Sequence, residues 1–361
     1  MRFSKMGFLI VPSFFFISFI TSCKAPQKNK FPDTEMYDLS NPTIINLPAA
    51  LDEISGISYY AKDTSVFAEI DEDGILFKVP VTHPADFKQW RFDTKKDFED
   101  IVLSDSVFYL LVSNGDIETV KFKGDSLYTT KSNFYTESVE EIKDEIKAKE
   151  QEKSKNNSGK KGKKEKKGKK KNGEKSGDEL KDKPEKEKKD KTLTETPEEK
   201  KERHLEKKEK KLNEFEGLFK TDSGTIVLVC KSCESDEKKR LSLYTFNYKD
   251  SAKSYTKLMS FDLAPIVEKL GDENIKIKPS AAAINPITKD LYILNSTGLQ
   301  FLMIFSPEGK FKEVFKLDPV IYKQPEGLTF TPAGDLIISN ESHKEGSGQL
   351  LIMKNKKKKN G

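Results

Sequence analysis

Five short phrases with carboxylate or polar side chains recur along the chain, and together they could hold a cation. The phrases open at Glu53, Glu99, Glu216, Ser280 and Glu326. A second polar position follows each opening, at Glu69, Asn114, Lys231, Asn295 and the pair Asn340 and Glu341. Carboxylate and amide oxygens suit Ca²⁺, which takes about 6–8 oxygen ligands. These residues are candidate ligands, with Lys231 as a charge partner or as a contact for an anionic group.

A structural role competes with the ligand role at these positions. Each glutamate could accept hydrogen bonds from backbone N–H groups at the junction between two repeats, and would then only position the strands. The phrases themselves fit both interpretations. Binding of Ca²⁺ would separate the two.

The elements that must position these residues are short strands in a repeated unit. Each phrase opens one strand, and a second and a third apolar strand follow it. The openings are 46, 117, 64 and 46 residues apart, and removing the 71 residues of a charged segment from 117 leaves 46. An amphipathic helical pattern at 263–271 accounts for the interval of 64. A unit of about 45 residues with several short strands is typical of a β-propeller blade.

We therefore predict an all-β fold with a single β-propeller over residues 41–353, interrupted by a charged insertion at 141–211. Five openings favour five blades, and a degenerate sixth blade would have to lie between residues 247 and 278. The early strand at 43–47 is expected to complete the last blade and close the ring. A β-sandwich is the alternative fold, but it does not predict one phrase at equal intervals.

The charge of the chain is unevenly distributed. Residues 141–211 hold 28 Lys/Arg and 19 Asp/Glu, a net charge of +9, whereas residues 31–140 and 212–353 hold 26 and 40, a net charge of −14. The centre of the insertion, 154–177, has too few apolar residues to fold, so we predict disorder there and frayed helices at 140–153 and 196–212. We expect a solvated spacer, an acidic body and no nucleic-acid partner.

The two ends of the chain are predicted to lie outside the fold. Residues 1–22 have the basic, apolar and small-residue order of a secretory signal peptide, and Cys23 follows Ser22 as in a bacterial lipobox. We therefore expect a lipid on Cys23, a lipidated linker at 23–40 and a basic tail at 354–361. This places the protein outside the cytoplasm, anchored to a membrane of the bacterial cell envelope. The leaflet is left open.

The repeated phrases also resemble a known family. Phe215-Glu216-Gly217-Leu218 and Pro325-Glu326-Gly327-Leu328, with Gly334-Asp335 after the latter, look like the SdiA-regulated, YjiK-like propellers. The resemblance covers about residues 47–353 without the insertion. It implies an exported propeller related in shape to bacterial phytases, with a link to calcium. The family's activity is not well defined, so the resemblance implies no substrate.

Two functional classes follow from these observations. The first is a lipid-anchored propeller with a monomeric body that binds or scaffolds, with Ca²⁺, a small ligand or an envelope protein as partner. The second is a metal-assisted phosphoester hydrolase, for which Lys231 is the only basic residue at the phased positions. No catalytic signature is present. Cys230 and Cys233 form either a local disulfide or two thiols, and residues 71–74 are expected to form a polar hairpin turn.

Overall fold

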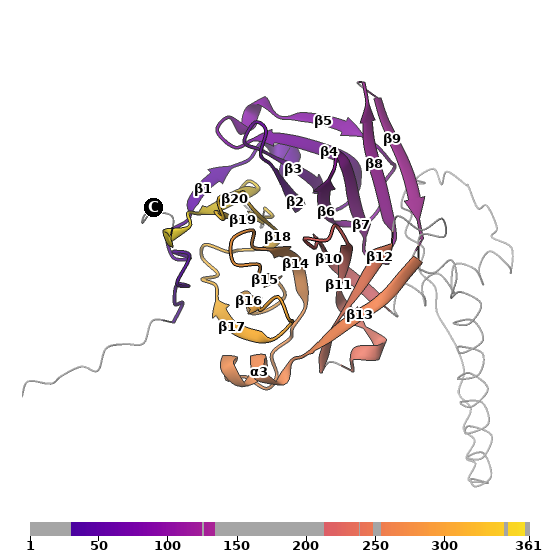
Figure 1. Ribbon diagram of the computed structural model, residues 1–361. Helices are drawn as coiled ribbons and strands as arrows, with labels where there is room; N and C mark the ends of the chain where they lie inside the picture. The colour runs from indigo at the N-terminus through magenta and orange to yellow at the C-terminus, as the bar shows by residue number, and fades with distance from the viewer. Residues whose placement is uncertain are drawn as a thin grey trace, which may run out of the picture. The chain divides into compact units, whose positions relative to one another are not determined.

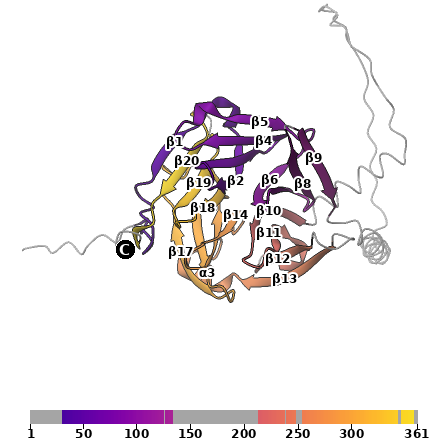
Figure 2. The same ribbon diagram turned by 45° about the horizontal axis from the view of Figure 1, so that its top comes forward.

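The computed structural model describes residues 30–124, 126–133, 213–237, 239–247, 254–342 and 346–357. In this part of the chain, five antiparallel sheets of four strands each surround a common axis (Figures 1 and 2). The prediction of an all-β propeller with five blades is confirmed. The predicted signal peptide, Cys23 and the 141–211 insertion lie outside the described residues. The prediction that all of 23–40 is a linker outside the fold was wrong, because Met36, Tyr37 and Leu39 are buried in the core beside the fourth and fifth blades.

The strands of each blade follow one another along the chain, from the axis outward. The first blade holds β2 (Ile54–Tyr60), β3 (Ser65–Ile70), β4 (Asp73–Pro80) and β5 (Lys88–Arg91). The second holds β6 (Phe98–Ser104), β7 (Val107–Val112), β8 (Ile117–Lys123) and β9 (Ser126–Ser132). The third holds β10 (Asn213–Lys220), β11 (Ile226–Cys233), β12 (Arg240–Asn247) and β13 (Ser254–Asp262). The fourth holds β14 (Pro279–Ile284), β15 (Leu291–Asn295), β16 (Phe301–Phe305) and β17 (Phe311–Lys316).

The fifth blade joins the two ends of the described chain. It consists of β18 (Pro325–Phe330), β19 (Leu336–Asn340), β20 (Gln349–Met353) and, as its outer strand, β1 (Thr43–Asn46). The early strand therefore closes the ring, as its position in the sequence predicts. The inner strands β2, β6, β10, β14 and β18 contact one another in sequence order, and β18 contacts β2 (Figure 2).

The expected interruptions of the repeat fall between or at the ends of blades. The charged insertion lies between β9 and β10, the last strand of the second blade and the first of the third. The helical pattern forms α3 (Ala264–Leu270), which ends at Gly271 in a left-handed conformation with φ 72°. Among the described residues, the interval from 247 to 278 holds only β13 and α3, so a sixth blade does not form there. None of the described helices is long and apolar enough to cross a membrane.

Each inner strand has a bulge at the repeated phrase. The register against the second strand shifts directly after the first paired residue in four blades, for example between Phe98 and Asp100, and after Glu214 and Phe215 in β10. A bulge turns the extra residue away from the ladder and re-aims its side chain. The glycines of the phrase allow close packing at the axis, since a Cβ on Gly56 would lie 2.5 Å from the Asp100 Cα.

Five buried apolar side chains occupy equivalent positions around the central axis and form the apolar ring, each in the core between two neighbouring blades. One side chain comes from the same position of each inner strand: Ile57, Ile101, Leu218, Ala282 and Leu328. Each is at most 2% exposed. All five line a cavity at one end of the channel, and none lines the cavity at the other end. The channel therefore has two separate mouths.

Candidate functional site: an acidic channel mouth

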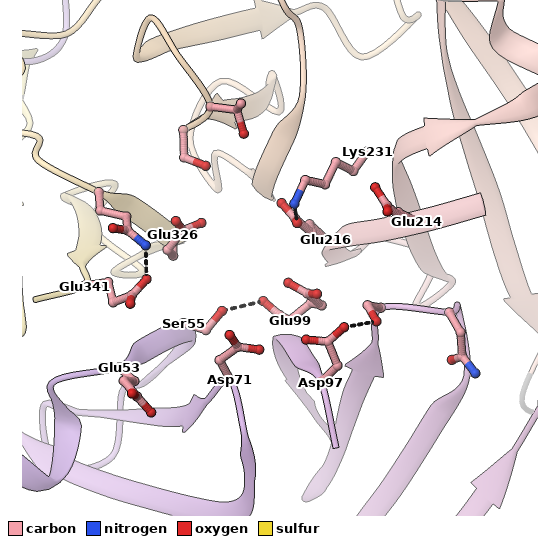
Figure 3. A pocket seen from close by; sticks show the side chains of 15 residues that line it. Glu53, Ser55, Asp71, Asp97, Glu99, Glu214, Glu216, Lys231, Glu326 and Glu341 are labelled. Atoms are coloured by element: carbon pink, nitrogen blue, oxygen red, sulfur yellow. Dashed lines mark hydrogen bonds and ion pairs between the residues drawn. The ribbon is translucent and has the colours of Figure 1, made fainter. Parts of the chain in front are cut away.

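The mouth at the beginning of the inner strands is a cavity of about 460 Å³ with a strongly acidic lining. Its wall contains eight carboxylates and a single basic residue, Lys231 (Figure 3). All five blades contribute residues to it. A concave site where several polar groups converge is the usual form of a binding site in a propeller or other closed scaffold.

The lining residues come from three positions of the repeat. Two residues before the bulge residue lie Glu53, Asp97, Glu214 and Gln324. At the bulge itself lie Ser55, Glu99, Glu216 and Glu326. At the end of the second strand or directly after it lie Asp71, Ser113, Lys231, Ser296 and Glu341. The site is therefore a product of fivefold repetition, with a different side chain at each copy of a position.

The structure brings most of the candidate residues together. Glu53, Glu99, Glu216, Glu326, Asn114, Lys231 and Glu341 all line the cavity. The remaining three candidates do not line it. Asn295 is buried and its Nδ2 donates to the carbonyls of Thr297 and Leu299, while the Asn340 Nδ2 donates to the carbonyl of Ile321 at 2.7 Å. These two asparagines fix loops, in line with the structural alternative.

Glu69 also lies outside the cavity wall and is completely buried. Its Oε1 accepts a hydrogen bond from the Gly56 N–H at 2.6 Å, and its Oε2 has no hydrogen-bond partner among the described residues. The pKa of Glu69 is raised to about 8, chiefly by burial and to a smaller extent by the charge of Asp71, while the hydrogen bond from Gly56 opposes the rise. The side chain therefore holds a proton at neutral pH, directly beneath the acidic mouth.

The equal spacing assumed from the sequence was wrong in the first blade. Ile54 pairs with Ile70 as Phe98 pairs with Val112, so Ser55, and not Glu53, corresponds to Glu99. The hairpin turns between the first and second strands differ in length, with residues 61–64 in the first blade and 105–106 in the second. A constant interval from the phrase therefore selects different structural positions in different blades.

The two serines at the bulge position show the alternative role of that position. The hydroxyl of Ser55 donates to the carbonyl of Glu99 at 3.0 Å, and Ser280 donates to the carbonyl of Pro325 at 3.0 Å. Each bond joins one blade to the next. Serine at the bulge thus links blades, and Ser55 lines the cavity as well, together with the three glutamates at this position.

The most compact group of acids in the cavity consists of Asp71, Asp97 and Glu99. One oxygen from each lies within 4.8 Å of the others, and Figure 3 shows the three side chains gathered on one side of the cavity. Burial raises the pKa of Asp71 to about 7 and that of Glu99 to about 10, and in both cases the charge of Asp97 adds to the effect. Like charges held this close need a proton or a cation.

The other side of the cavity contains a positively charged side chain, Lys231. The Lys231 ammonium forms an ion pair with Glu216 (Figure 3). Burial, followed by the charge of Glu341, raises the pKa of Glu326 to about 7, and the charge of Lys231 opposes that rise. Within the described part of the chain, no ion pair involves Asp71, Asp97 or Glu99.

Sequence reasoning missed three of the cavity acids. Asp97 and Glu214 precede the phrases that drew attention, and Asp71 was assigned only to a polar hairpin turn. Asp71 does lie in that turn, immediately after β3, and from there it reaches the cavity. The available signal was the alternation of acids two residues apart, in Asp97-Phe98-Glu99 and Glu214-Phe215-Glu216.

The two cysteines flanking Lys231 form a disulfide. Cys230 and Cys233 are bonded with their Cα atoms 6.0 Å apart, which resolves the open choice between a disulfide and two thiols. Both side chains are buried. The bond encloses the end of β11, on which Lys231 lies.

Comparison with known proteins gives no family. No protein-family model matches the chain, and no curated protein matches it. Among solved structures, a luciferin-regenerating enzyme superposes with a TM-score of 0.41 at 10% identity, covering 87% of this chain and 95% of that one. Regucalcin from Agrobacterium tumefaciens, described as a calcium-binding protein, gives 0.41 at 11% identity, with coverage of 90% and 96%. Virginiamycin B lyase from Staphylococcus aureus gives 0.36 at 9% identity, with coverage of 82% and 67%.

Similarities at this level carry no argument about function. The propeller assignment depends on the five sheets of the chain itself. The resemblance to the SdiA-regulated propellers stays a prediction, because no protein-family model matches the chain.

Proposed function

We propose that this propeller is a binding module whose acidic mouth holds a divalent cation, with Ca²⁺ as the preferred ion. The observation that carries the proposal is the approach of Asp71, Asp97 and Glu99, whose oxygens lie within 4.8 Å of one another without a lysine or arginine between them. Hard cations take carboxylate ligands in this kind of arrangement. Waters and further oxygens of the cavity would complete the coordination.

The environment of the three acids supports a cation over an anion. Eight carboxylates line the cavity, and its single lysine is engaged by Glu216. The field inside the cavity therefore attracts cations and repels phosphate. This balance favours binding over the alternative phosphoester hydrolase, which needs several basic groups around the substrate. A phosphatase screen with and without Ca²⁺ tests the alternative. Robust turnover of a phosphoester would favour the hydrolase over the binding module.

Isothermal titration calorimetry tests the proposed cation site. Metal-free protein is titrated with CaCl₂ and MgCl₂ at neutral pH, as wild type and as the double variant Asp71→Asn with Asp97→Asn. Asp105→Asn is the matched control, since Asp105 follows the far end of the same strand, β6. We expect a saturable heat with wild type and control and a loss of at least about tenfold in affinity in the double variant. Equal heats in all three proteins, or no heat in any, would contradict the proposal.

The location of the module is a separate part of the proposal. We propose that Cys23 carries a lipid and tethers a monomeric body to the bacterial cell envelope, where a small ligand or an envelope protein meets the acidic mouth. The signal-like order of residues 1–22 supports this. Metabolic labelling with a clickable fatty acid tests it, with Cys23→Ala as control. Equal labelling of both chains would contradict it.

A further inference from the structure

The second mouth of the channel is a cavity of about 370 Å³ with a different lining. It lies where the inner strands end. Its wall includes the apolar ring and is mostly aliphatic and aromatic. Tyr59, Phe219, Ile284 and Phe330 contribute to it. A volume of several hundred Å³ with apolar walls is the normal range for a site that binds a small organic molecule.

One charged residue lines this cavity, Lys220 at the end of β10. Its ammonium donates to the Ser104 hydroxyl at 3.2 Å, and that hydroxyl donates in turn to Asp105 at 3.3 Å. Lys220 makes no direct ion pair within the described chain. Lys289, at the same end of the channel, does pair directly, with Asp222 at 3.1 Å. A half-buried ammonium beside apolar walls, bonded only to a hydroxyl, is complementary to an anionic group.

Two hydroxyls in the wall add polar contacts. Ser58 accepts the Leu103 N–H at 3.1 Å, and Thr329 accepts the Tyr59 N–H at 3.2 Å. Each hydroxyl keeps its own hydrogen, which it can donate to an acceptor. The mouth therefore combines a large apolar wall with one ammonium and a few hydroxyl donors, which is the pattern of a site that orients an amphiphilic ligand.

We propose that this mouth binds a small amphiphilic anion, a carboxylate with an alkyl or similar apolar body. The apolar body lies against the five inner strands and the apolar ring that lines this cavity, and the carboxylate meets the Lys220 ammonium. A chain of about ten carbons fits a cavity of about 370 Å³. This site is separate from the acidic mouth and does not depend on cation binding there.

The test compares decanoate with decanol, both below their aggregation limits, by calorimetry. Wild type, Lys220→Gln and Ala283→Phe are titrated, with Lys289→Gln as the matched lysine control. We expect decanoate to bind wild type and the control equally and to bind Lys220→Gln at least about tenfold more weakly, while decanol is insensitive to that change. Ala283→Phe, which fills the cavity, should weaken both ligands.

Far-UV circular dichroism shows that each variant is folded, and a Ca²⁺ titration reports separately on the acidic mouth. Equal affinity of wild type for decanoate and decanol would leave an apolar cavity without selection for an anion and would overturn the proposal. Decanoate affinity unchanged in Lys220→Gln, or in Ala283→Phe, would also overturn it. Failure of Ca²⁺ to bind any variant would contradict the proposed function and leave this result standing.

Discussion

The two mouths of the central channel are built from the same five inner strands, yet their linings are opposite in chemistry. One mouth holds eight carboxylates and one lysine, whereas the other is mostly apolar with one lysine. The apolar ring of Ile57, Ile101, Leu218, Ala282 and Leu328 lines the second mouth and contributes nothing to the first. The two linings therefore belong to opposite halves of the same strands.

The comparison shows how a repeat can carry two sites. Every inner strand begins with a bulge, whose side chain is re-aimed, and continues as a regular strand beyond the apolar ring. Polar residues at the bulge and around it make the acidic mouth. Residues four or five positions later make the apolar mouth, and each blade can vary one half without changing the other.

The largest expected effect on stability comes from truncating one side chain of the apolar ring. Leu218 is 1% exposed, and Leu218→Ala should lower the free energy of unfolding by about 2–5 kcal/mol, because it removes buried apolar area and leaves a cavity. Urea denaturation measures this. Leu258→Ala, at a residue that is 47% exposed, is the control and should change stability by less than about 0.5 kcal/mol. Similar losses in both variants would mean that Leu218 does not contribute to the core between the second and third blades.

The dependence of stability on pH tests the buried carboxyl of Glu69, which lies next to the acidic mouth. Folding raises the pKa of Glu69 to about 8 from its ordinary value of 4.5, so the folded state binds more protons than the unfolded state between these values. Stability is therefore greatest at low pH in this window and falls as the pH rises through about 8. In metal-free protein we expect the Glu69 carboxyl to lower the free energy of unfolding by roughly 2–4 kcal/mol between pH 5 and pH 8.5, measured by urea denaturation.

Glu69→Gln provides the control for this pH dependence. The amide keeps an oxygen that can accept the Gly56 N–H but cannot ionise. The variant should show a flatter stability profile than wild type, and the difference should grow across the whole window between about 4.5 and about 8. Identical profiles would show that Glu69 does not carry the pH dependence.

A smaller effect is expected from the only lysine in the acidic mouth. Lys231→Gln removes a positive charge from the cavity, so Ca²⁺ should bind more tightly, by roughly fivefold, or about 1 kcal/mol. Calorimetry measures the change at fixed ionic strength. Lys289→Gln removes a lysine near the opposite mouth and should leave Ca²⁺ affinity unchanged. Weaker binding in Lys231→Gln would show that Lys231 helps to form the site.

The repeat made the fold predictable, but it did not determine the site. Five copies of one phrase give the blades, the closing strand and the place of the insertion, because a blade needs the same strand pattern each time. The cavity also depends on turn lengths, which is why Glu53 was placed where Ser55 belongs. Asp71 and Asp97 occupy repeat positions at which the other blades carry different side chains, so only the assembled propeller shows that they meet Glu99. The apolar mouth gives no signal, since its residues look like ordinary strand residues.

The most direct test of the cation site is anomalous diffraction from crystals grown with Mn²⁺ or Tb³⁺ in place of Ca²⁺. We expect one strong peak in the acidic mouth, about 2.1–2.6 Å from oxygens of Asp71, Asp97 and Glu99, and none in the apolar mouth. Crystals of the Asp71→Asn and Asp97→Asn double variant should lose that peak and keep the fold. A peak elsewhere, or none in the acidic mouth at saturating ion, would contradict the account.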